Sequence, residues 1–137
     1  MPKRTKREQL DDAISRGDID TVRELTAGRF DPDAMLGWGE NPLMVAARHG
    51  HIDVARYLLE CGADLEARSS KGSTALSYAA FEGRLDMVKF LVEQGADIHA
   101  RNDLNWTPLF EAALQGRAEI LTFLIEKGAE VNLIEKE

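Results

Sequence analysis

Residues 72–100, GSTALSYAAFEGRLDMVKFLVEQGADIHA, contain most of one structural period of this chain. Thr74 is a good N-cap for a short helix, and Gly83 permits the positive φ angle that ends one. After Gly83, apolar residues recur at steps of three and four, which predicts a second helix that Gly95 terminates. The segment that begins at Ala96 is short, polar and turn-rich, so we expect an extended hairpin there.

The same pattern recurs along the chain every 33 residues. One glycine series at this interval is Gly17, Gly50, Gly83 and Gly116, and a second is Gly62, Gly95 and Gly128. Leucine keeps the same interval at Leu25, Leu58, Leu91 and Leu124. Such a period is typical of stacked helical-pair repeats, which present a surface rather than enclose an active site.

Three of these units resemble the ankyrin repeat. The Thr-Pro-Leu-His motif of that family appears as Asn41-Pro42-Leu43-Met44, Thr74-Ala75-Leu76-Ser77 and Thr107-Pro108-Leu109-Phe110. The closing Gly-Ala-Asp appears as Gly62-Ala63-Asp64, Gly95-Ala96-Asp97 and Gly128-Ala129-Glu130. The motif's histidine is missing from all three units. In the family it bonds hairpin backbone across neighbouring repeats, so another group must take this role or the hairpins are less rigid.

The resemblance implies an all-α solenoid of stacked helix-turn-helix units joined by hairpin loops. We expect a single domain, 1–137, with full repeats at 36–68, 69–101 and 102–134 and a divergent capping repeat at 8–35. The first seven residues carry four basic side chains, Lys3, Arg4, Lys6 and Arg7. They predict a flexible basic arm over 1–7, with electrostatic docking as the alternative. No dedicated polar cap follows Asn132, so apolar surface at this end is expected to stay exposed.

The 33-residue period separates structural from functional residues. Aromatic residues that recur at equivalent positions are assigned to the scaffold: Tyr57, Phe90 and Phe123. Aromatic residues that do not recur need another explanation: Trp38, Tyr78, Phe81 and Trp106. The resemblance places these positions on the hairpin tips and on the inward face of the first helices, which line a concave groove. The alternative is that an indole packs over its own hairpin.

We expect this groove to bind a protein partner. The predicted partner-binding residues are Trp38, Glu40, Arg48, His49, Lys71, Tyr78, Phe81, Glu82, Leu104, Trp106, Glu111, Leu114 and Gln115. The polar members form a mixed rim of both signs, which fits a folded protein better than a nucleic acid.

Composition excludes several other classes. The net charge of −7 and the pI near 5.0 argue against a nucleic-acid binder. No apolar run reaches the roughly 18 residues of a membrane span, and no apolar stretch that could form a signal peptide follows the first residues. Cys61 is the only cysteine, which fits a reducing compartment, and we therefore expect a cytoplasmic protein.

Catalysis finds little support in the sequence. His49 and His51 have no third ligand at metal spacing, and Cys61 has no histidine beside it in the repeat pattern. A small solenoid offers no water-excluding cleft. We expect no enzyme activity, no cofactor and no metal.

Two functions remain open. The first is a binding module, acting as an adaptor or as an inhibitor of the immunity or antitoxin type. The alternative is a structural subunit that self-associates through its uncapped C-terminal repeat, so the chain is expected to be a monomer or a weak homo-oligomer.

Overall fold

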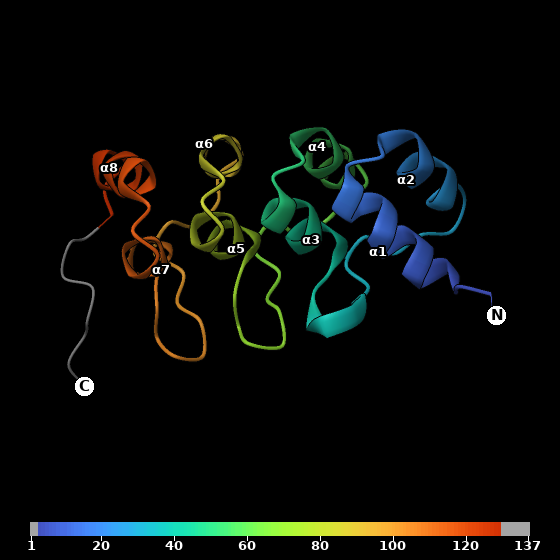
Figure 1. The fold of residues 1–137 in the computed structure, drawn as a ribbon, viewed down its shortest axis with the longest axis horizontal. Helices are drawn as coiled ribbons and strands as arrows, with labels where there is room; N and C mark the ends of the chain where they lie inside the picture. The colour runs from blue at the N-terminus through green and yellow to red at the C-terminus, as the bar shows by residue number, and fades with distance from the viewer. Residues whose placement is uncertain (1–2, 130–137) are drawn as a thin grey trace.

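The computed structural model describes residues 3–129, which form eight α-helices and one 3-10 turn, with no strand in this range. The helices are α1 (Lys6–Arg16), α2 (Ile19–Leu25), α3 (Pro42–His49), α4 (Ile52–Glu60), α5 (Ala75–Phe81), α6 (Leu85–Glu93), α7 (Pro108–Leu114) and α8 (Ala118–Glu126), and the turn η1 is Gly37–Gly39. The odd-numbered helices form one layer and the even-numbered helices a second, while long loops project beyond α3, α5 and α7 (Figure 1). This arrangement confirms the all-α solenoid.

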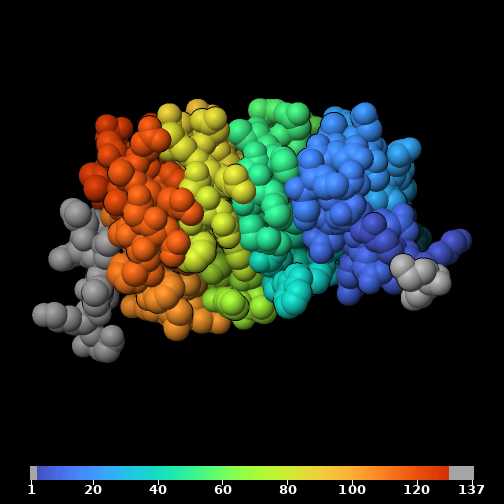
Figure 2. Space-filling model, in the orientation of Figure 1, coloured from blue at the N-terminus to red at the C-terminus, as the bar shows by residue number. Residues whose placement is uncertain are grey.

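Each helical pair is one unit of the stack. The units follow one another as successive slabs along the long axis of the molecule, from blue to red (Figure 2). Residues 1–2 and 130–137 lie outside the described range, and with them the predicted end of the last repeat and the missing cap expected after Asn132.

The first helix of each full repeat begins at the predicted cap. Asn41, Thr74 and Thr107 each accept a hydrogen bond from the backbone N–H three residues on, at 2.9, 3.4 and 3.2 Å. Pro42 and Pro108 occupy the first helical position, where the missing N–H costs the helix nothing. The local sequence therefore defines the start of all three helices.

The core lies between the two layers. Small buried alanines line the first helices: Ala46, Ala47, Ala79, Ala80 and Ala112. Fully buried leucines at equivalent positions line the second helices: Leu58, Leu91 and Leu124. The aromatic series belongs to this scaffold as predicted, because Phe90 is buried and Tyr57 and Phe123 pack against the core. Apolar burial of this kind contributes about 25 cal/mol per Å².

A side chain from each repeat lies across a glycine of the preceding repeat. His51 Nε2 is 2.8 Å from the Ser15 carbonyl oxygen, and Arg84 Nε–H donates to the Arg48 carbonyl at 3.0 Å. A Cβ atom at Gly17, where φ is 72°, would lie 2.6 Å from His51 Nδ1. Glycine here therefore allows the left-handed turn and also leaves room for the next repeat.

Backbone groups connect the hairpins across repeats. Ser70 N–H donates to the Gly39 carbonyl at 3.0 Å, and Asp103 N–H donates to the Lys71 carbonyl at 3.1 Å. Carboxylates also accept backbone hydrogen bonds from the following repeat. Asp64 N–H donates to Asp33 Oδ1 at 3.0 Å, and Asp97 N–H donates to Glu66 Oε2 at 2.8 Å. These bonds connect neighbouring repeats in the absence of the motif histidine.

The N-terminal unit begins earlier than expected. Thr5 caps α1, and its reciprocal bonds with Glu8 complete a capping box. Arg4 donates to the Glu8 carbonyl at 3.1 Å. Lys6 and Arg7 therefore lie in a helix rather than in the basic arm expected over residues 1–7.

Alanine substitutions separate the two roles of the first glycine series. Gly17→Ala and Gly116→Ala both place a side chain at positive φ, 72° and 69°, which costs about 1–2 kcal/mol. Gly17→Ala also displaces His51 from its bond to Ser15, so we expect it to reduce the free energy of unfolding by about 1 kcal/mol more. A Cβ at Gly116 meets no atom of residues 3–129 within 4 Å. Urea unfolding measures both variants, and equal losses would show that His51 moves without cost.

Candidate partner-binding groove

A groove of about 830 Å³ runs along the hairpins and the inward face of α3, α5 and α7. Ten predicted residues line it: Trp38, Glu40, Arg48, Lys71, Tyr78, Phe81, Glu82, Leu104, Trp106 and Glu111. The three predicted residues that do not line it are His49, Leu114 and Gln115. The groove therefore spans three consecutive repeats, and its role in binding stays a prediction.

Trp38 has the most unusual conformation in the groove. It lies in the turn η1 between two glycines, its φ angle is 64°, and its side chain is 88% exposed. A left-handed conformation is strained for a bulky residue by about 1–2 kcal/mol. Its equivalents in the next two repeats, Lys71 and Leu104, do not have positive φ. The alternative that this indole covers its own hairpin is wrong, because the ring is open to solvent.

Trp106 is placed differently. It is half-buried, and its ring lies 5.3 Å from the ring of Phe110 on α7, measured between centroids. One part of the indole therefore packs on its own repeat, as the alternative predicted, while the rest lines the groove. Leu104 and Phe81 continue this apolar wall, and Leu104 is 64% exposed.

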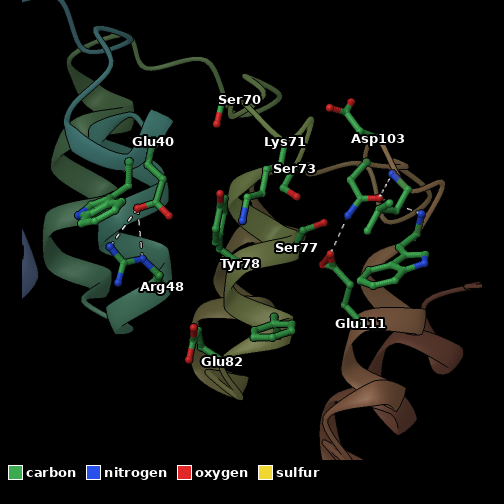
Figure 3. A pocket seen from close by; sticks show the side chains of 15 residues that line it. Glu40, Arg48, Ser70, Lys71, Ser73, Ser77, Tyr78, Glu82, Asp103 and Glu111 are labelled. Carbon is green, nitrogen blue, oxygen red and sulfur yellow. Dashed lines mark hydrogen bonds and ion pairs between the residues drawn. The ribbon is translucent and has the colours of Figure 1, made fainter.

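Two carboxylates that were expected on a solvated rim are buried in the groove floor. Glu40 is 7% exposed and Glu111 is 5% exposed. Glu40 accepts from Arg48 Nη2 at 2.9 Å and from Arg48 Nε at 3.2 Å, so its charge is compensated within the same repeat. Figure 3 shows this pair between the start of the repeat and α3, which carries Arg48, with Glu111 on the opposite side of α5.

Glu111 points from α7 toward Ser77 of α5 (Figure 3). Its Oε1 accepts from Asn102 Nδ2 at 3.1 Å, and its carboxyl group also bonds the Ser77 hydroxyl. Burial raises the pKa of Glu111 to about 7, and these two hydrogen bonds oppose the rise. The carboxyl group is therefore close to half-protonated at neutral pH.

Tyr78, on α5, lies between the two buried carboxylates. Burial raises the pKa of its phenol, a hydrogen bond from Ser69 lowers it, and the neighbouring Glu40 raises it further. The phenol stays protonated at neutral pH and presents a polar tip on an aromatic body, a combination common at interfaces.

The three predicted residues outside the groove lie at the C-terminal ends of the first helices. His49 is half-buried and stacked on His51, with ring centroids 6.2 Å apart. Burial lowers the pKa of His49, and the charge of Arg48 lowers it further. Leu114 and Gln115 are exposed at the end of α7. Their equivalents at the end of α5, Phe81 and Glu82, do line the groove.

Five lining residues were not predicted: Ser70, Ser73, Ser77, Asn102 and Asp103. Ser73 is equivalent by the 33-residue period to Glu40 and Trp106, which were predicted. Extending each predicted position to its equivalents would have found it. The three serines and Asn102 gave no aromatic or charge signal of their own.

No group of three or more His, Cys, Asp or Glu side chains within residues 3–129 could hold a metal ion. Over the same range, no helix is both long and apolar enough to cross a bilayer. Cys61 is exposed on α4's C-terminal cap.

Stacked helical pairs with an open concave groove define a class of repeat proteins that act through surface recognition. The family model for ankyrin repeats, in three copies, matches residues 10–102, and a single ankyrin repeat matches residues 104–136. The chain belongs to the ankyrin-repeat family. These repeats are general protein–protein interaction modules and are typically non-catalytic. No curated protein matches the sequence.

The buried carboxyl group makes stability depend on pH. In the unfolded chain Glu111 releases its proton near its ordinary pKa of 4.5, whereas the folded protein retains it until about pH 7. The folded state thus binds more protons in this window, and stability falls as pH rises through it. Glu111→Gln removes this loss while preserving the shape of the side chain. The loss amounts to about 3 kcal/mol, so we expect the melting temperature of the variant to gain about 6–12 °C on wild type between pH 4.5 and pH 8.

Thermal unfolding of both proteins across this pH range measures the effect. Glu93→Gln, at an exposed position of α6, is the control for loss of one surface charge. A constant difference between Glu111→Gln and wild type from pH 4.5 to pH 8 would contradict the assigned pKa.

Proposed function

We propose that this ankyrin-repeat protein recognises a folded protein partner through the groove and the hairpin tips. The observation that carries the proposal is Trp38. A tryptophan that is 88% exposed and held at a φ angle of 64° is costly twice, once in unburied apolar surface and once in backbone strain. A partner that covers the indole removes the first cost, and the strained turn holds the ring in place beforehand.

The remaining groove lining has the composition of a recognition surface. Aromatic and aliphatic groups, among them Tyr78, Phe81 and Trp106, alternate with charged residues of both signs, such as Lys71 and Glu82. Interface anchors are enriched in tryptophan, tyrosine and arginine, and a polar rim supplies specificity. A groove of about 830 Å³ open to solvent accommodates a protruding segment of a folded protein.

Two modes of action are compatible with this surface. As an adaptor, the chain holds its partner for a third component. As an inhibitor of the immunity or antitoxin type, it covers the active site of its partner. Both need only tight binding, and neither requires a chemical reaction on this chain.

We further propose a cytoplasmic setting, because Cys61 is an exposed free thiol. We also propose no direct role with nucleic acid or membrane, because the net charge is −7.

Affinity capture with the intact chain, followed by three variants, tests the proposal. Trp38→Asn retains a residue that tolerates positive φ, so we expect unchanged stability and an affinity reduced at least tenfold. Trp106→Ala is expected to weaken binding similarly, at a stability cost of about 1–2 kcal/mol from its packing on Phe110. Phe90→Ala is the control on the scaffold: it loses about 3–5 kcal/mol of stability, and its groove is unchanged. Unimpaired binding by both tryptophan variants would show that the groove is not the recognition surface.

Self-association is the alternative function. Leu114 and Ile125 are exposed apolar residues of the last repeat, on α7 and α8. Such residues at the end of a solenoid can dock on a second copy.

Light scattering separates the two functions. We expect a mass near 15.2 kDa at all concentrations if the groove is the only interface. A concentration-dependent dimer that Leu114→Glu abolishes, and that Trp38→Asn leaves intact, would instead support the structural subunit.

A further inference from the structure

The two buried carboxylates of the groove floor differ in how their charge is balanced. Glu40 forms an ion pair with Arg48 at 2.9 Å. Glu111 is buried to the same degree, yet its partners are the neutral Asn102 and Ser77. No cation forms an ion pair with Glu111 within the described residues 3–129. The floor therefore contains one compensated carboxylate and one uncompensated one.

The two carboxylates occupy different positions of the repeat. Glu111 is equivalent to Val45 and Tyr78, whereas the equivalents of Glu40 are Ser73 and Trp106. The position of Arg48 is taken by Phe81 and Leu114 in the next two repeats, so neither of them supplies a base there. A buried carboxylate that lacks a positive partner costs several kcal/mol if it ionises, so its retention calls for an explanation.

The surroundings of Glu111 favour a cation with an apolar stem. Trp106, Phe81 and Leu104 line the same groove and offer aromatic and aliphatic surface. The other charged or titratable groups that line the groove are Glu40, Arg48, Lys71, Tyr78, Glu82 and Asp103. Four carboxylates thus face two bases, and one of these bases is already paired with Glu40. The groove therefore lacks the positive charge that would balance its carboxylates.

We propose that the groove accepts one basic side chain, a lysine or arginine of the partner, whose charged end pairs with Glu111. This inference rests on the proposed function of the groove. The aliphatic stem of such a side chain packs on Trp106 and Leu104, and its cation lies within reach of the indole face. A fork of guanidinium donors suits a carboxylate whose other hydrogen bonds come from Asn102 and Ser77.

Binding of this kind is coupled to proton release. With a pKa of about 7, a large share of Glu111 is protonated in the free protein at pH 6, and the proton must leave before the cation pairs. Affinity for a basic partner therefore rises about tenfold from pH 6 to pH 8 and then levels off. A neutral or acidic partner gives no such rise.

A display library of random twelve-residue loops, each closed by a disulfide, provides the probe. Such loops imitate an exposed loop of a folded protein. They are selected on the intact wild-type chain at pH 8, and those that lose binding to Trp38→Asn or Trp106→Ala are taken as groove binders. We expect these loops to contain an arginine or lysine whose replacement by glutamine weakens binding at least tenfold.

Glu111→Gln is expected to weaken the same loops at least tenfold and to abolish the pH dependence. The loss on combining it with the loop's basic-to-glutamine change should be far from additive. Because Glu111→Gln is predicted to be at least as stable as wild type, weaker binding will not reflect unfolding. Glu93→Gln, at an exposed position of α6 outside the groove lining, is the control for loss of one surface carboxylate, with an expected change below about threefold.

Each outcome decides between the two proposals. Groove-binding loops without a basic residue, or loops indifferent to Glu111→Gln, would overturn the pairing and leave groove recognition intact. Loops indifferent to both tryptophan variants, or a selection that yields no loops, would count against groove recognition and the pairing together.

Discussion

The structure depends on how closely the first helices of neighbouring repeats approach one another. Helices α3, α5 and α7 meet through buried alanines, among them Ala46, Ala79 and Ala112. A single helical pair of this size cannot bury its apolar face alone, because an isolated helix of seven to nine residues is unstable in water. Each repeat therefore folds only against its neighbours.

The close approach also sets where the functional side chains can be. Since equivalent residues of successive repeats lie side by side, the inward positions on α3, α5 and α7 are occupied by Val45, Tyr78 and Glu111. A valine, a phenol and a carboxyl group in one row cannot all serve the same packing role. The middle and last members are instead engaged in polar contacts across the groove, Tyr78 with Glu40 and Glu111 with Ser77.

Much of the fold was predictable from the sequence, because its determinants are local. Caps such as Thr74, the glycines at positive φ and the apolar spacing all act within one repeat. The placement of the aromatic residues at the groove was also predictable, since the 33-residue period distinguishes Trp38 and Phe81 from residues that recur. The period compares chemical identity at equivalent positions, and this is sufficient to find irregular residues.

The chemical state of the groove was not predictable. Glu40 and Glu111 appear in the sequence as ordinary polar residues, and their burial arises only when the repeats pack together. The ion pair between Glu40 and Arg48 depends on the geometry of the chain between the two residues, and the 33-residue period carries no information about that geometry. The strained φ angle of Trp38 was also missed, although its flanking glycines mark a tight turn.

The groove crosses three repeats that are otherwise linked mainly as nearest neighbours. In a linear array of this kind, the terminal units can open while the centre stays folded, so the chain need not unfold in one step. A ligand that touches α3, α5 and α7 together forms contacts between units that do not meet directly. Occupation of the groove would therefore hold the three repeats together, so that they unfold in a single cooperative transition instead of opening one at a time.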